Sequence, residues 1–166
     1  MDKAVVILQK NSKAVASKKS DRTLGAGVIE SYIHGAGKVG VLVELSCETD
    51  FVAKNEDFKK LAYDIAMHVA ASSPEFLNQD EITEAAKQTA TEVFIKDIEG
   101  KPADMISKIA EGQVDKHFAE KCLLEQPFVK NPDQTVGDYV KEHNAKLGEN
   151  IVVRRFSRMA LGEVSE

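Results

Sequence analysis

The sequence lacks several features that would assign it to a class of protein at once. No stretch approaches the roughly 18 consecutive apolar residues that a membrane-spanning helix needs. The apolar patch Ala4–Leu8 follows Asp2 and has neither a cationic region nor a cleavage site, so we do not expect a secretory signal. Cysteine is scarce: Cys47 and Cys122 form no CxxC motif, which favours reduced thiols in a cytosolic protein over a disulfide scaffold.

Positive charge is in deficit. Lysine and arginine total 22 against 27 aspartates and glutamates, for a net charge of −5, so non-specific binding to nucleic acid is not expected. Residues 10–22 are a local exception with four lysines and Arg22. We interpret them as a solvated arm, with RNA binding as an alternative that a steep salt dependence would reveal. Hydrophobic residues make up 43% of the 166, enough to bury a core.

Two strands are expected first. Residues 27–34 are rich in strand-forming side chains, and residues 39–47 alternate with a period of two. Between them, residues 34–38 read as a hairpin loop. The run Gly35-Ala36-Gly37-Lys38-Val39-Gly40 matches GxGxxG, but a strand follows where a dinucleotide site needs a helix, so we favour the hairpin.

Helical spacing then replaces the two-residue period. Apolar residues from Phe58 to Val69 predict a helix that is capped by Thr49 or Asp50 and ended by Ser72-Ser73-Pro74. A second helix is expected from about residue 81 to 98. The residues expected on its buried face are Ile82, Ala86, Thr89 and Val93.

Three further elements complete the order. A third helix opens at Pro102 after a stop at Gly100, and residues 126–127 and 131–133 are expected to break structure. Thr135 caps a short helix, and a strand follows over about 151–159. The short helix is expected to bury Val136, Val140, His143 and Leu147. The order β-β-α-α-α-α-β predicts an α+β, two-layer fold: a small three-stranded antiparallel sheet packed against helices.

The residues that could carry chemistry show no catalytic or metal-binding pattern. The four histidines have no metal-ligand spacing with each other or with the cysteines, so we expect no metal and no cofactor. His143 is expected in the core and His117 in solvent. Cys47, at the end of an apolar strand, is expected to be a packed thiol. An enzyme that pairs Cys47 with a histidine base is an alternative that thiol alkylation would test.

The segment from Cys47 to Asn55 is the most unusual feature, because Phe51 and Val52 stand among polar residues where a strand gives way to a helix. Phe51 either staples the helix start and completes the core, or projects as an anchor for a partner protein. On the helix that follows, Met67 is expected opposite the apolar face and His68 on its shoulder, which would make a second contact patch.

At these residues the sequence resembles the elongation factor Ts family. The strongest match is Thr49-Asp50-Phe51-Val52-Ala53-Lys54-Asn55, and residues 65–76 make a second long match. Shorter matches follow in order at residues 126–129, 135–137, 142–145, 148–151 and 154–156. The resemblance implies the same strand and helix order. It also implies a guanine-nucleotide exchange factor for the GTPase elongation factor Tu, without covalent chemistry and therefore not an enzyme.

The resemblance also implies a site. Thr49, Asp50, Phe51 and Val52 would enter the partner's nucleotide-binding domain and disturb its Mg²⁺ site, with Phe51 between its helices. Met67 and His68 lie in the segment that would touch a second, β-barrel domain of elongation factor Tu.

The resemblance further implies a domain organisation. Residues 1–23 would be the remnant of an N-terminal helical domain plus a basic linker, and residues 24–166 a core and dimerisation domain. We expect a homodimer in a two-plus-two complex, without direct nucleic-acid or membrane binding. The bacterial cytoplasm is the expected location, with an organellar matrix as the alternative. The alternative function is a binding module for elongation factor Tu with little exchange activity, because most of the N-terminal domain is missing.

Overall fold

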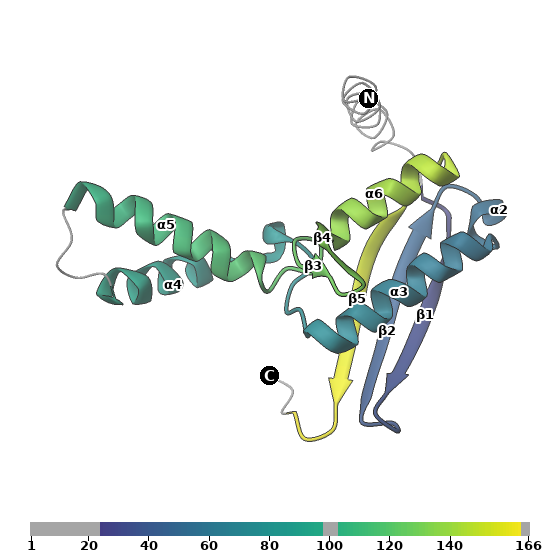
Figure 1. Cartoon of the computed structure of the whole chain (residues 1–166), viewed down its shortest axis with the longest axis horizontal. Helices are drawn as coiled ribbons and strands as arrows, with labels where there is room; N and C mark the ends of the chain where they lie inside the picture. The colour runs from purple at the N-terminus through teal and green to yellow at the C-terminus, as the bar shows by residue number, and fades with distance from the viewer. Residues whose placement is uncertain (1–23, 98–102, 164–166) are drawn as a thin grey trace.

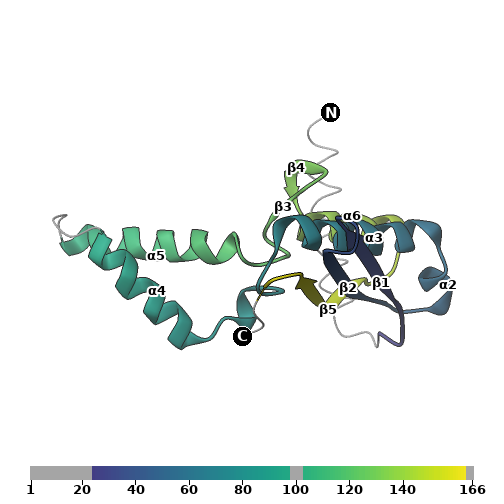
Figure 2. The ribbon, with the colours of Figure 1, turned by 90° about the horizontal axis from the view of Figure 1, so that it is seen from below.

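The computed structural model describes residues 24–97 and 103–163, and the predicted N-terminal remnant, Gly100 and Pro102 lie outside them. One layer is an antiparallel sheet in the order β1-β2-β5, made of β1 (Ala26–His34), β2 (Val39–Cys47) and β5 (Val152–Ala160). Helices α3 (Glu56–Ser72) and α6 (Val136–Leu147) cover one face of it (Figures 1 and 2). The α+β, two-layer prediction is confirmed.

The β1–β2 hairpin follows the predicted alternation. The side chains of Val41, Val43 and Leu45 are buried towards the helices, whereas Leu42 between them is exposed on the opposite face. The glycine-rich run is a hairpin turn that leads into β2, and Gly35 and Gly37 adopt the positive φ angles of 61° and 88° that the turn requires. The hairpin interpretation is therefore confirmed, and the run does not begin a helix.

The start of α3 differs from the prediction. A separate short helix, α2 (Asp50–Ala53), comes first and is capped by Thr49, whereas α3 is capped by Asn55, whose Oδ1 accepts from the Asp57 N–H at 2.8 Å. Thr49 therefore does not cap the long helix, because the extended backbone of Asn55 interrupts it. The predicted end is confirmed, since Ser73, just before Pro74, is left-handed with φ 47°.

Helices α4 (Glu84–Asp97) and α5 (Ala103–Ala119) form an arm that extends away from the sheet (Figure 1). The arm has a hydrophobic cluster of its own. Its members are Ile82, Val114, Phe118 and Cys122, with Phe76, Ala86, Ala90 and Phe94 packed against them.

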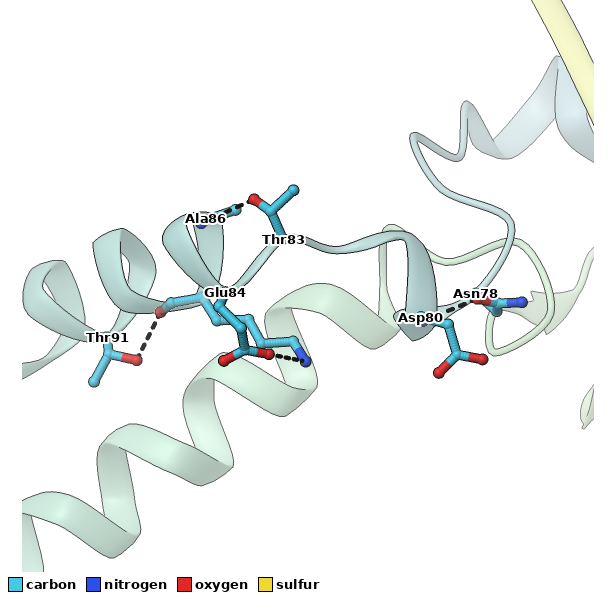
Figure 3. A network of polar contacts seen from close by, with 7 residues as sticks. Asn78, Asp80, Thr83, Glu84, Ala86 and Thr91 are labelled. Atoms are coloured by element: carbon cyan, nitrogen blue, oxygen red, sulfur yellow. Dashed lines mark hydrogen bonds and ion pairs between the residues drawn. The ribbon is translucent and has the colours of Figure 1, made fainter.

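Two residues predicted on the buried face of α4, Thr89 and Val93, are exposed instead. The predicted face stepped three residues from Ala86 to Thr89, whereas the buried series starting at Ile82 continues in steps of four. The first turn begins after Thr83, whose Oγ1 accepts from the Ala86 N–H at 3.3 Å (Figure 3). The helix consequently turns Ala86, Ala90 and Phe94 inward, one residue in every four.

A small hairpin was not predicted. Strands β3 (Pro127–Phe128) and β4 (Asn131–Thr135) pair where structure breakers were expected, and they lead directly into α6. The cap of α6 is as predicted: Thr135 Oγ1 accepts from the Asp138 N–H at 3.1 Å. The helix ends at the left-handed Gly148, also as predicted.

The histidines and cysteines divide between confirmed and wrong predictions. His143 is buried, as predicted, and so is Cys47, which confirms its reading as a packed thiol. His117 is not solvated: it is half-buried, with its ring centroid 5.7 Å from Phe94 and 5.3 Å from Phe118. Of the described helices, none has the length and apolar character that spanning a membrane takes.

Candidate functional site

The junction between β2 and α3 presents one aromatic side chain to solvent. Thr49 has an extended backbone, and its Oγ1 accepts from the Val52 N–H at 3.4 Å, which caps the four-residue helix α2. Within α2 the side chains of Val52 and Ala53 are buried in the main core, whereas Phe51 is 82% exposed. Phe51 therefore projects into solvent and does not complete the core, whereas its role as an anchor for a partner stays a prediction.

The same geometry divides the four predicted contact residues. Asp50 and Phe51 are exposed and adjacent, so both are accessible to a partner. Thr49 is exposed but engaged in hydrogen bonds, and the side chain of Val52 faces the core. Contact of Val52 with a partner stays a prediction. In the structure its buried side chain attaches the short helix to the core.

Glu149 meets this junction from the loop between α6 and β5. Its Oε2 accepts from the backbone N–H groups of Glu48 and Thr49, each at 3.1 Å, and its Oε1 accepts from the Thr49 hydroxyl at 2.5 Å. Sequence reasoning placed Glu149 in a family match but gave it no role. No signal within the sequence joins it to residues about 100 positions away.

Negative charge gathers beside the Cys47 thiol. Burial raises the pKa of Cys47, and the charges of Glu149 and Asp50 raise it further, while backbone hydrogen bonds from Thr49 and Ala53 oppose them in part. The thiol therefore stays protonated near neutral pH, which is the wrong state for a nucleophile. This environment gives no support to an enzyme that uses Cys47.

The predicted second contact patch required His68 to lie on the surface, but the structure buries it. Its ring is fully buried, and its Nδ1 accepts from the Val129 N–H at 3.2 Å. The proton therefore lies on Nε2, which donates to Gln126 Oε1 at 2.9 Å. The predicted surface position is wrong because hairpin β3–β4 folds over this end of α3. Its contact with a partner stays a prediction.

Met67 is half-buried rather than fully opposite the core. It lines an apolar groove of about 290 Å³, and the other lining residues are Tyr32, His34, Ala70, Ala71, Val129 and Lys130. The groove lies towards the C-terminal end of α3, whereas α2 lies at its N-terminal end (Figure 1). The two candidate contact regions are therefore separated by the length of this helix.

Comparison with known proteins covers both regions. Residues 13–163 match the family described as Elongation factor TS. The chain is 50% identical over 165 residues to Elongation factor Ts of Carboxydothermus hydrogenoformans, a match that spans 98% of this chain and 76% of that protein. It is 49% identical to the protein of the same name from Heliobacterium modesticaldum over 165 residues, which are 98% of this chain and 77% of that protein. It is also 48% identical over 164 residues to Elongation factor Ts of Geobacter metallireducens, a match that spans 98% of this chain and 76% of that protein.

Proposed function

The chain belongs to the elongation factor Ts family, and we propose that it is a guanine-nucleotide exchange factor for the GTPase elongation factor Tu. The observation that carries the proposal is the 82% exposure of Phe51, on a short helix whose next two side chains are buried. An exposed aromatic side chain on a short helix that is fixed to the core suits a role as a binding anchor, because aromatic anchors supply much of the binding energy of protein interfaces. We place the reaction in the bacterial cytoplasm.

In the proposed mechanism, Phe51 inserts between helices of the partner's nucleotide-binding domain. Asp50, exposed beside it, brings a carboxylate towards the partner's Mg²⁺ and phosphate site. In such GTPases the ion bridges the nucleotide phosphates, so a displaced ion weakens the hold on GDP. Thr49 caps the helix that carries both residues, and Val52 roots it in the core.

The proposed exchange makes and breaks no covalent bond. The chain binds the nucleotide-free partner more tightly than the GDP-bound partner, and by linkage GDP lowers the chain's own affinity to the same degree. GTP then displaces the factor by the same competition. The chain therefore needs no nucleophile, and a protonated, buried Cys47 suits this role.

We propose the groove beside Met67 as the contact for the second domain of elongation factor Tu. Val129 and Lys130 line it from hairpin β3–β4. His68 lies behind the groove and accepts a hydrogen bond from the N–H of Val129, which lines it. Met67 would thus touch the partner, and His68 would place the hairpin that completes the groove.

A homodimer in a two-plus-two complex is the proposed assembly. On the sheet face opposite α3 and α6, the side chains of Ile29, Ile33, Leu42 and Met159 are between 51% and 74% exposed. The strand register places Ile33, Gly40 and Met159 side by side across this face. An apolar sheet face left open to water suits packing against a second copy, sheet on sheet.

Release of a fluorescent GDP from elongation factor Tu tests the exchange. We expect the wild-type chain to accelerate release and Phe51→Ala to lose about 30-fold, since an aromatic anchor is worth about 2 kcal/mol or more. Val93→Ala is the control, because Val93 is 53% exposed on α4, at the other end of the molecule (Figure 1). A full rate with Phe51→Ala contradicts the anchor, and a full rate with Asp50→Asn contradicts the role of the carboxylate. Binding without acceleration would indicate the binding-module alternative.

Light scattering across micromolar concentrations tests the dimer. We expect twice the chain mass, and a monomer for Leu42→Asp, which places a charge at the centre of the open sheet face. Val93→Asp introduces the same charge on α4 and should leave the mass unchanged. A wild-type chain that is monomeric at every concentration excludes this assembly.

A further inference from the structure

Two loops at one end of the sheet exchange carboxylate hydrogen bonds. Glu149, between α6 and β5, accepts from the backbone N–H groups of Glu48 and Thr49. In return, Glu48 Oε1 accepts from the Asn150 N–H at 2.8 Å. The loops meet because β2 and β5 are antiparallel neighbours, with Ser46 opposite Val152. Each loop therefore uses a side chain to hold the backbone of the other.

Glu149 also sets the direction of the Thr49 hydroxyl. That hydroxyl has one hydrogen, and it donates to Glu149 Oε1 at 2.5 Å. Its oxygen lone pairs are then left for the Val52 N–H, which donates to it at 3.4 Å. The cap of α2 thus depends on an acceptor that lies outside the helix and its flanking residues.

The loop that carries Glu149 is itself fixed. The Gly148 N–H donates to the Asn144 carbonyl at 3.1 Å, and the Ile151 N–H donates to Asn144 Oδ1 at 3.2 Å. The side chain of Ile151 is buried in the main core. The loop that positions Glu149 at the junction is therefore fixed to the end of α6 by hydrogen bonds.

A helix as short as α2 cannot hold its own shape. It spans only Asp50–Ala53, and the first turn of a helix orders several residues for a single hydrogen bond. Its orientation must come from outside contacts, which include the buried side chains of Val52 and Ala53, the bonds from Glu149 and the bond from the Cys47 thiol to the Thr49 carbonyl at 3.3 Å. The buried pair holds the C-terminal end. At the N-terminal end the Cys47 thiol makes one weak hydrogen bond to the Thr49 carbonyl, whereas Glu149 accepts from both the N–H and the hydroxyl of Thr49.

We propose that Glu149 is a positioning residue for the exchange segment, residues 49–53, and that it fixes the direction in which Phe51 projects. The inference rests on the exchange function proposed above, but the immobilisation of Phe51 can be measured without a partner. A pre-oriented anchor binds faster and more tightly, because less conformational freedom is lost on association. Without Glu149 the short helix would sample several directions, and only a fraction of them would fit the partner.

The first experiment measures the motion of residue 51 alone. The chain contains no tryptophan, so Phe51→Trp introduces a single indole whose fluorescence anisotropy decay reports local motion. We expect Glu149→Ala, added to Phe51→Trp, to raise the amplitude of the fast decay about twofold. Glu142→Ala, an exposed change of the same charge on α6, should leave it unchanged. Glu149→Gln should give an intermediate amplitude, because an amide can accept from the backbone but cannot accept from the hydroxyl through its nitrogen.

The second experiment is a double-mutant cycle on exchange. We expect Glu149→Ala to reduce the second-order rate of GDP release about tenfold when Phe51 is present. In the Phe51→Ala background the same change should cost less than twofold, because residues that act through one another are not additive. Glu149→Gln repeats the cycle with a milder change if the alanine variant folds poorly.

The two experiments separate the possible failures. An unchanged fast decay with Glu149→Ala, or an equal loss of exchange in both backgrounds, overturns the positioning role. If the wild-type chain accelerates no release, the exchange function fails, and the anisotropy result alone then decides whether Glu149 immobilises residue 51.

Discussion

His68 makes the stability of this fold depend on pH. Burial lowers the pKa of His68, and the hydrogen bond to Gln126 opposes this only in part. The neutral ring accepts from the Val129 N–H through Nδ1 and so ties hairpin β3–β4 to α3. A proton on Nδ1 would face that N–H, and neither group could accept from the other. The native state therefore resists protonation more than the unfolded chain does.

The sign and size of the effect follow from this. The pKa of a histidine in the unfolded chain is about 6.5, so the contribution of neutral His68 to the free energy of unfolding is fully present above that pH. It is lost progressively as the pH falls from there towards the lower pKa of the folded chain. A buried donor left without its acceptor costs about 1–3 kcal/mol. For a chain of this size, each kcal/mol corresponds to about 2–4 °C in Tm.

Urea unfolding followed by circular dichroism at pH 7.5 and pH 5.0 measures the loss. His68→Gln is the matched variant: its amide can donate towards Gln126, but it does not titrate. We expect this variant to be less stable than the wild type at pH 7.5 and to lose less stability on acidification. Carboxylates and the other histidines contribute equally to both proteins, so the difference reports His68. Equal losses in the two proteins would refute the reasoning.

Three further outcomes are expected. Tyr139→Phe should cost about 1.5–3 kcal/mol in urea unfolding, because the Tyr139 hydroxyl donates to the buried Asp64 carboxylate at 2.9 Å, and a bond to a charged group has that value. Gly137→Ala should cost about 1–3 kcal/mol, because the new Cβ would lie 2.8 Å from the Leu124 carbonyl oxygen; an unchanged urea midpoint would show that the backbone relaxes. Cys122, whose pKa burial raises to about 11, and the buried Cys47 should react with a thiol reagent at pH 8 only as fast as the chain unfolds; rapid labelling of the native protein would contradict this.

The sheet and its covering helices could be predicted from the sequence because burial there repeats with a fixed period. In β2, the side chains of Val41, Val43 and Leu45 all face the helix layer, so the two-residue alternation can be recognised in the sequence itself. The same holds for Phe58 and Ile65 on α3, which recur with helical spacing. Pattern and packing agree in these elements, so local reasoning sufficed.

Elsewhere the decisive partner lies far away in the sequence. His68 sits where the helical period placed it, but its burial depends on Gln126 and Val129, 58 and 61 residues later. The hairpin that supplies them has a proline in each strand, Pro127 and Pro132, and no alternating pattern that would predict it. For α4, the buried residues Ala86, Ala90 and Phe94 recur every four positions, so a step of three from Ala86 to Thr89 predicted the wrong face.

The interruption between α2 and α3 explains why Phe51 is exposed at all. Phe51 and Phe58 are seven residues apart, and in one continuous helix positions i and i+7 share a face. A helix running unbroken from Asp50 to Ser72 would therefore turn Phe51 to the side on which Phe58 is fully buried. Asn55 prevents this, because its extended backbone ends the first helix and its side chain caps the second. Two residues of the same type thus have opposite roles, one in the core and one as a proposed anchor, because a single cap separates them.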